Sequence, residues 1–133
     1  MQDLEKACWN LDTSLANHIL PKLLYFKHWV KRYGMPEDLE EEDWEEILDE
    51  MIWAFSYVHK DYPRLSDLLI EDIKFINEKE LENGFIQCDL ETIYVEGKTE
   101  EDYKAAVEKD KANLARCQTG LNLFSKYYMS LWI

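Results

Sequence analysis

Apolar residues recur every three or four positions along three long stretches of this chain of 133 residues. That spacing places them on one face of an α-helix. The stretches run from about Ser14 to Tyr33, from Glu40 to His59, and from Thr99 to about Leu131. Only four glycines and three prolines are present, fewer than the turns of a sandwich or barrel require. The sequence therefore predicts an all-α fold, a helical bundle of three long helices plus a shorter helix in an insert, within one domain over residues 1–133.

The two ends of the first helix carry recognisable signals. Asp12 or Thr13 can cap its first turn, and Gly34 followed by Pro36 stops it. Pro21 lies inside the apolar pattern, where it removes a backbone donor, so we expect one helix with a kink.

The last helix begins with the clearest signal, Thr99 as the cap and acidic residues in the first turn. At about 1.5 Å per residue this helix would reach roughly 50 Å, which is longer than a small bundle needs. Part of its apolar stripe is then expected to bury against a second copy, which predicts a homo-oligomer.

The insert is expected at about residues 60–97. Residues 64–79 fit a third, shorter helix whose inward positions are Leu65, Leu68, Leu69, Ile73 and Ile76. Asn83 and Gly84 then break the chain. We interpret residues 85–97 as a loop, with a hairpin-like excursion as the alternative, because the strand-like run 93–95 has no evident partner.

The formal net charge of −13 argues against general affinity for nucleic acid or an anionic membrane, because phosphate binding relies on clustered Lys and Arg. Cys8, Cys88 and Cys117 form no CxxC pair, which is typical of proteins in a reducing compartment. The first residues lack the pattern of a secretory signal, and no apolar run approaches the ~20 residues of a membrane span. We therefore expect a cytoplasmic protein.

The charge is unevenly distributed along the chain. No acid occurs from residue 13 to 36 or in the last 23 residues, whereas residues 37–50 contain ten acids and no base. One interpretation is that the basic first helix packs beside the acidic second helix. The other is that the first helix and the end of the last one form a positive pocket for an anion, through Lys22 and Lys126.

No hydrolase, kinase, dinucleotide-binding or P-loop motif is present, and the three histidines do not have zinc-ligand spacing. We therefore predict no catalytic residue, metal or cofactor, and we favour a non-enzymatic protein. The run from Glu41 to Glu46 resembles the EExxE element of all-α nucleotide pyrophosphohydrolases of the MazG type, in which carboxylates hold Mg²⁺. Candidates for the second acidic helix of that family do not reproduce its spacing; they are Glu71, Asp72, Glu78 and Glu80. A solvated acidic face is the favoured interpretation, and an acidic DNA mimic is a further alternative.

Aromatic residues are abundant, with five Trp and eight Tyr. Trp29, Trp53 and Tyr57 lie on the flanks of the first two helices, where they could line an interface or stack on a ring-bearing ligand. Packing in the core or in a dimer is the alternative.

Both ends of the chain resemble a family of small hypothetical proteins of tailed bacteriophages. The shared pattern lies within residues 9–58 and 111–132, and its residues are Trp9, Leu11-Asp12, Ile19, Pro21, Leu23, Gly34, Pro36, Trp44, Ile47-Leu48-Asp49, Met51-Ile52, Ala54-Phe55, Leu123-Phe124, Lys126-Tyr127-Tyr128 and Leu131-Trp132. The resemblance implies a phage-encoded protein in the cytoplasm of an infected bacterial host, and it implies no particular activity.

Our hypothesis is a non-enzymatic phage accessory protein that binds a host protein and interferes with a host process such as antiviral defence, without binding nucleic acid or membrane. The alternatives are a sponge for a small anionic nucleotide signal, the Mg²⁺-dependent pyrophosphohydrolase, and the DNA mimic. The expected binding residues are Asp12, Lys22, Trp29, Trp53, Tyr57, Lys126 and Tyr127.

Overall fold

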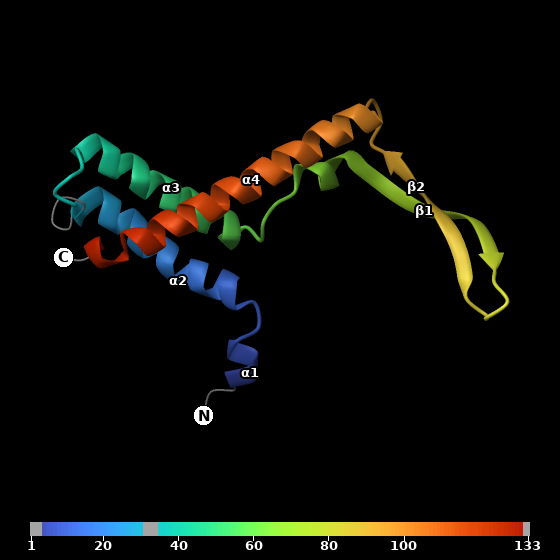
Figure 1. The fold of residues 1–133 in the computed structure, drawn as a ribbon, viewed down its shortest axis with the longest axis horizontal. Helices are drawn as coiled ribbons and strands as arrows, with labels where there is room; N and C mark the ends of the chain where they lie inside the picture. The colour runs from blue at the N-terminus through green and yellow to red at the C-terminus, as the bar shows by residue number, and fades with distance from the viewer. Residues whose placement is uncertain (1–3, 31–34, 132–133) are drawn as a thin grey trace. The chain divides into compact units, whose positions relative to one another are not determined.

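The computed structural model describes residues 4–30 and 35–131 and divides the chain into two compact units (Figure 1). One unit comprises the residues up to Pro63 together with those from Asn113 onward, and the other comprises Arg64–Ala112. The elements, in order, are α1 (Leu4–Ala7), α2 (Leu11–Tyr25), the π-helical η1 (Phe26–Val30), α3 (Glu41–His59), the 3₁₀ segment η2 (Leu65–Leu69), β1 (Ile70–Glu80), β2 (Ile86–Tyr94), α4 (Glu100–Lys126) and the 3₁₀ segment η3 (Tyr128–Ser130).

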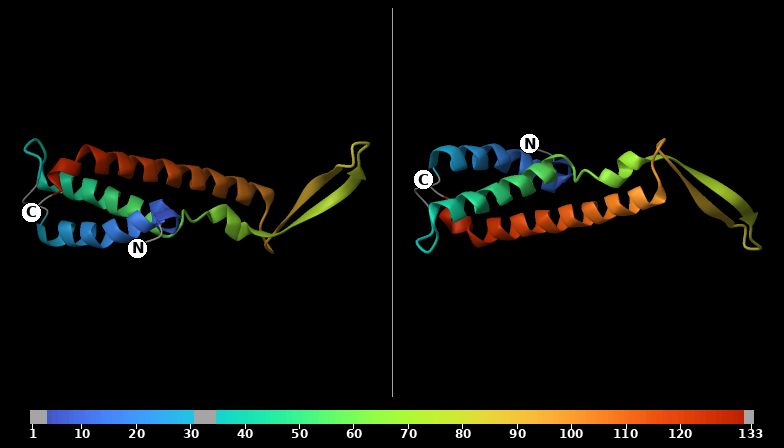
Figure 2. Two further views of the ribbon diagram at one scale, coloured as in Figure 1. Left: turned by 90° about the horizontal axis from the view of Figure 1, so that it is seen from below. Right: turned by 90° about the horizontal axis from the view of Figure 1, so that it is seen from above.

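In the first unit α3 lies beside α2 and beside the second half of α4, and it runs antiparallel to both (Figure 2). The core is built around α3, whose Trp44, Leu48 and Met51 are fully buried. Phe55 and Val58 continue the same face, so the apolar stripe predicted for this helix is confirmed. Its acidic residues lie on the opposite side because the helical period separates the two sets.

The packing of α3 against α4 depends on a glycine. A Cβ atom on Gly120 would lie 2.5 Å from both the Ala54 Cβ and the Glu50 carbonyl oxygen. Two helix backbones can approach so closely only where both side chains are small. Beside this point the Cys117 Sγ lies 3.7 Å from the Ala54 carbonyl oxygen.

The first long helix begins earlier than predicted. Its N-cap is Asn10, in a left-handed conformation and without a side-chain cap hydrogen bond, so the prediction of Asp12 or Thr13 as the cap is wrong. Pro21 lies inside α2, which continues through it into η1. The expected end at Tyr33 and the stop at Gly34 lie outside the described residues.

The start of α4 confirms the predicted cap. The Asp102 backbone N–H donates to the Thr99 Oγ1 at 3.2 Å, and the Asp102 carboxylate accepts from the Thr99 N–H at 2.9 Å. This reciprocal pair is a capping box with aspartate at its third helical position. The helix ends at Lys126, so it is about 40 Å long.

The prediction of an all-α bundle is wrong, because the second unit contains a two-stranded antiparallel sheet of β1 and β2. Residues expected to form a third helix instead form η2 and β1, and the segment interpreted as a loop contains β2. Gly84, with φ of 84°, belongs to the turn between the strands. β1 contains Ile70, Ile73, Phe75 and Ile76, which favour a strand, and β2 alternates polar with apolar residues, so the two segments pair as strands.

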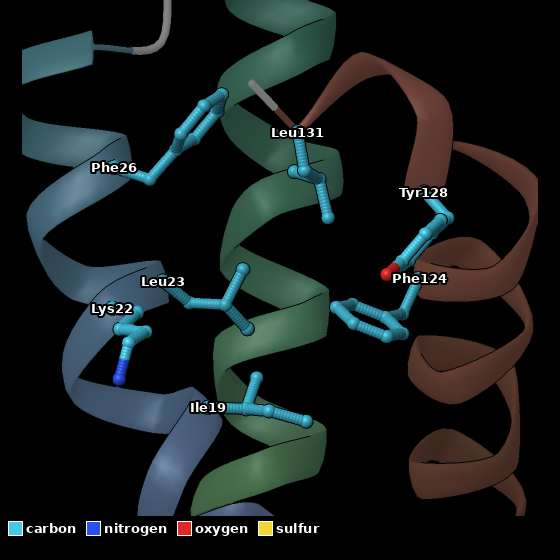
Figure 3. A pocket seen from close by; sticks show the side chains of 7 residues that line it. All are labelled: Ile19, Lys22, Leu23, Phe26, Phe124, Tyr128 and Leu131. Atoms are coloured by element: carbon cyan, nitrogen blue, oxygen red, sulfur yellow. The ribbon is translucent and has the colours of Figure 1, made fainter. Parts of the chain in front are cut away.

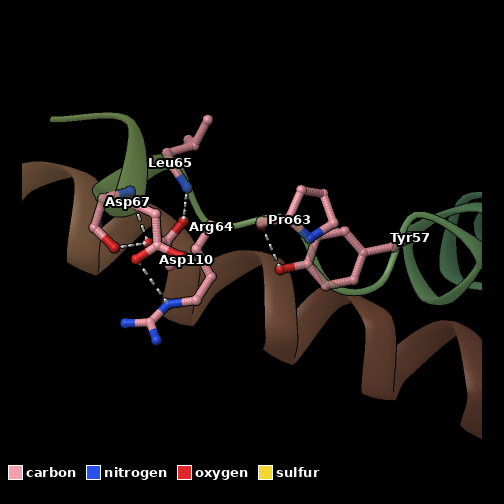
Figure 4. A network of polar contacts seen from close by, with 7 residues as sticks. Tyr57, Pro63, Arg64, Leu65, Asp67 and Asp110 are labelled. Carbon is pink, nitrogen blue, oxygen red and sulfur yellow. Dashed lines mark hydrogen bonds and ion pairs between the residues drawn. The ribbon is translucent and has the colours of Figure 1, made fainter. Parts of the chain in front are cut away.

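The base of the hairpin is attached to α4 within the second unit. The Asp110 carboxylate accepts hydrogen bonds from the backbone N–H groups of Leu65 and Ser66, at 2.7 and 3.1 Å, and from the Ser66 hydroxyl at 2.6 Å (Figure 4). The ring centroids of Tyr94 and Tyr103 lie 5.8 Å apart. A buried carboxylate therefore serves the function of a cap for η2.

None of the helices in the described ranges has the length and apolar character that a membrane crossing requires.

Candidate functional site

One side of the hairpin carries exposed apolar side chains. In the register of the sheet, Phe75 pairs with Leu90 and Ile73 pairs with Thr92. Alternate residues of a strand share a face, so Ile86 joins Leu90 on this side. We call Ile73, Phe75, Ile86 and Leu90 the hairpin apolar face; these side chains are 48, 66, 66 and 62% exposed.

The other side of the hairpin is mostly polar. Lys74 pairs with Glu91 and Lys79 with Gln87, and only Ile76 and Ile93 are apolar there. The register shifts by one residue between Ile76 and Lys79, and Asn77 in this bulge has φ of 53°. A bulge of this kind changes which residues of β1 face each side, and it adds twist.

The hairpin has strong negative charge. Residues 70–94 contain two lysines against seven acids, which are Glu71, Asp72, Glu78, Glu80, Glu82, Asp89 and Glu91. Because the sheet has only two strands, each strand also has one edge without a strand partner in the described chain. An isolated two-stranded sheet with an apolar side in water is marginal, whereas contact with a further surface would stabilise it.

The first unit contains a hollow of about 170 Å³ between α2 and the end of the chain's last helix. Figure 3 shows its lining, which is Ile19, Lys22, Leu23, Phe26, Phe124, Tyr128 and Leu131. Lys22 is the charged member, and the Lys22 Nζ lies 3.3 Å from the His18 Nε2. Of the predicted binding residues, Lys22 alone belongs to this hollow.

Ion pairs join the acidic α3 to both neighbouring basic segments. Lys27 of η1 pairs with Asp49, and Arg116 of α4 donates to both oxygens of Glu50 at 2.9 and 3.0 Å. The Arg116 hydrogen bonds lower the pKa of Glu50. These contacts support the interpretation in which complementary charges flank the packed helices.

The aromatic binding residues predicted on α3 contact one another. Trp53 stacks on Tyr57 with ring centroids 5.1 Å apart and planes 10° apart, and the Arg116 guanidinium lies 4.1 Å from the Trp53 centroid. Tyr57 is 6% exposed, and its hydroxyl donates to the Pro63 carbonyl oxygen at 3.2 Å (Figure 4). Packing within the chain thus accounts for this pair. Trp29, in contrast, is 67% exposed, with His28 against its ring.

The predicted polar residues are dispersed over the first unit. The Asp12 carboxylate accepts a hydrogen bond from the Tyr62 hydroxyl at 2.7 Å, so Asp12 ties the start of α2 to the segment after α3. The Lys126 Nζ lies 5.1 Å from the centroid of the Tyr127 ring, and that ring packs edge-on against Trp44. Neither Lys126 nor Tyr127 lines the hollow beside Lys22.

The acidic start of α3 offers the hydrolase alternative little support. Four glutamates line an open hollow of about 420 Å³, and they are Glu40, Glu41, Glu42 and Glu45. Glu71, Asp72, Glu78 and Glu80 lie on β1, so the second acidic helix that this alternative requires is absent from their segment. In the part of the chain that the structure describes, no group of three or more potential ligands is placed to hold a metal ion.

Sequence reasoning missed the hairpin apolar face. The signal that could have found it is the alternation of β2, in which Ile86, Cys88, Leu90 and Thr92 are separated by Gln87, Asp89 and Glu91. Comparison with family profiles, curated proteins and solved structures finds no match.

Proposed function

We propose that this chain is a non-enzymatic binding protein that docks onto a partner protein through the hairpin apolar face. The observation that carries the proposal is the exposure of four large apolar side chains on one side of a two-stranded sheet. Contiguous apolar surface of this kind is characteristic of interaction sites, whereas scattered exposed apolar residues are ordinary.

The charge of the hairpin indicates the chemistry of the partner. Residues 70–94 carry seven acids against two lysines, so a complementary surface is apolar at its centre and bordered by Lys and Arg. A second copy of this chain would bring the same acids together, which weakens self-association through this face. We therefore favour a basic partner protein.

Apolar contact alone is insufficient for firm binding. Covering these four half- to two-thirds-exposed side chains would contribute roughly 4–7 kcal/mol. Association costs about 4–15 kcal/mol, so the partner must add charge pairing or further contacts. The open edges of β1 and β2 offer such contacts, because an extended segment of the partner can add to the sheet as a third strand.

The resemblance to tailed-phage proteins sets the cellular context that we propose. The partner would be a host protein in the cytoplasm of an infected bacterium, and occupation of its basic surface would interfere with a host process. The negative charge would also raise the rate of association with such a target.

A pair of matched variants tests the proposal. Phe75→Ser removes the largest side chain of the apolar face, and Gln87→Ser changes an exposed residue on the opposite side of the same hairpin. We expect tagged wild type and Gln87→Ser to recover the same host protein, and Phe75→Ser to lose most of it. The affinity between this protein and the purified host protein should fall as the salt concentration rises, because salt screens the charge pairs at the border of the interface.

Two results would contradict this function. If Phe75→Ser and Gln87→Ser recover equal amounts of the host protein, the hairpin apolar face does not take part in the interaction. Light scattering that shows a dimer of the wild type and a monomer of Phe75→Ser would make a second copy, rather than a host protein, the occupant.

A further inference from the structure

The hollow between α2 and the end of the chain's last helix differs in chemistry from the hairpin, and it lies wholly in the first unit. Its walls are apolar: Ile19, Leu23 and Phe26 come from one side, and Phe124 and Leu131 from the other (Figure 3). Leu23 and Phe26 are buried, whereas Ile19, Phe124 and Leu131 are partly buried. The walls therefore belong to the core but remain accessible from the hollow.

The charge around the hollow is positive although the protein is acidic. Lys22 is its charged lining residue, and no carboxylate pairs with Lys22 among the residues that the structure places. Lys27 and Arg116, on neighbouring elements, are paired with Asp49 and Glu50. Residues 13–30 and 111–131 contain no acid, so the two segments that line the hollow carry positive charges only.

Two polar groups border the apolar walls. The Tyr128 hydroxyl is directed toward the group of lining residues (Figure 3). In Figure 3 the Lys22 ammonium is directed away from the other lining side chains and lies beside His18. Its side chain is exposed, so a change of rotamer on the picosecond to nanosecond scale can turn it toward a ligand. An ammonium and a phenol can together donate to the oxygens of one carboxylate.

We propose that this hollow binds a small amphipathic monoanion, a carboxylate carried on one aromatic ring or a short alkyl chain. A volume of about 170 Å³ is comparable to the roughly 150 Å³ cavity that accepts benzene, and it is below the ~300 Å³ of pockets for drug-sized ligands. The apolar part of the ligand packs on Leu23, Phe26 and Phe124. Its carboxylate accepts hydrogen bonds from Lys22 and Tyr128.

This site is independent of the hairpin and requires no partner protein. The same dimensions disfavour a nucleotide, whose base, ribose and phosphates exceed the hollow and whose multiple charges exceed the one lysine. Lys126 was predicted to help bind an anion, but it takes no part in this site. Its ammonium lies over the Tyr127 ring, and it does not line the hollow.

Fluorine NMR of 4-fluorobenzoate with the full-length protein tests the site. We expect the ligand signal to broaden, and we expect 4-fluorobenzyl alcohol, which has the same ring without the charge, to bind more weakly. Lys22→Gln should lower the benzoate affinity about fivefold, the scale of one exposed charge contact, and remove the preference over the alcohol. Tyr128→Phe should lower the affinity less. Unlabelled hexanoate should displace the probe.

Lys126→Gln is the matched control, because it removes one positive charge near the same end of α4 without altering the lining. Equal losses in Lys22→Gln and Lys126→Gln would overturn the proposal in favour of non-specific attraction. Absence of broadening at millimolar probe would overturn it too. More effective displacement by adenosine 5′-monophosphate than by benzoate would identify a nucleotide site instead. Circular dichroism of each variant establishes that it folds.

Discussion

The Asp110 Oδ2 of α4 lies 2.6 Å from the Ser66 Oγ at the start of η2, and both residues are buried. Burial by itself would raise the pKa of Asp110. Hydrogen bonds from Ser66 and Leu65, with the positive charge of Arg64, outweigh that effect and hold its pKa below the ordinary value of 3.8. The ionised carboxylate is thus the form that attaches the base of the hairpin to α4.

Acid should weaken this attachment. A carboxyl group whose folded pKa is lowered contributes stability above its unfolded pKa, and that contribution is lost as pH falls through the folded value. We expect the protection of the Leu65 and Ser66 amide protons, relative to their intrinsic exchange rates at each pH, to fall as the pH drops below about 3.8. Amide exchange followed by NMR at a series of pH values below pH 6 measures these protection factors. In Asp110→Asn both amides should be poorly protected already at pH 6, and protection factors that stay constant with pH in the wild type would refute the assignment.

Gly120→Ala should destabilise the first unit even though alanine is the better helix former by about 1 kcal/mol. The added methyl group would meet the Glu50 carbonyl oxygen and the Ala54 side chain at 2.5 Å. Overpacking of this kind costs about 1–3 kcal/mol, so after the gain in helix propensity the net loss in free energy of unfolding is expected at about 0–2 kcal/mol. Urea denaturation measures it. Ser125→Ala, exposed on the same helix, is the control and should stay within about 0.5 kcal/mol of the wild type.

The Tyr62 hydroxyl should ionise at a pH well above the ordinary pKa of a tyrosine. The hydrogen bond that its hydroxyl donates to Asp12 is the main reason that its pKa is raised to about 12. An ultraviolet titration should show one phenol ionising near pH 12, and Asp12→Asn should bring it back toward the ordinary value of 10. By linkage, this contact supports the fold fully below about pH 10 and loses its effect as pH rises through 12. An unchanged titration curve in Asp12→Asn would show that the contact does not form in solution.

Arg116→Lys should cost stability despite the conserved charge. The guanidinium donates two hydrogen bonds to Glu50 and also covers the Trp53 ring, a geometry that an ammonium cannot reproduce. Because both partners are partly exposed, the expected loss is about 0.5–1 kcal/mol. Thermal unfolding compares it with Lys111→Gln, which breaks the exposed pair with Glu108 and should change little. Equal losses of stability in the two variants would mean that the contact of Arg116 with Glu50 stabilises the fold no more than an exposed ion pair does.

Local signals were sufficient where one segment carries a long, consistent pattern. The face of α3 from Trp44 to Val58 and the Thr99 cap of α4 follow from helical periodicity and capping chemistry. The pairing of the basic and acidic helices follows from the charge distribution, as Lys27 and Asp49 illustrate. The candidate site was much less accessible to such reasoning, because the lining of the hollow between α2 and the end of the last helix includes Lys22 but no other predicted binding residue.

The sequence by itself determined the long helices, their buried faces and the separation of charge, because these depend on residues three or four positions apart. Only the tertiary structure decided that residues 70–80 form a strand, since Ile73 and Ile76 also fit helical spacing and strand pairing is a non-local contact. The same holds for Asp110, whose partners lie 44 and 45 residues away. Gly120 owes its role to the approach of another helix. The hairpin apolar face and the hollow beside Lys22 likewise exist only once distant segments meet.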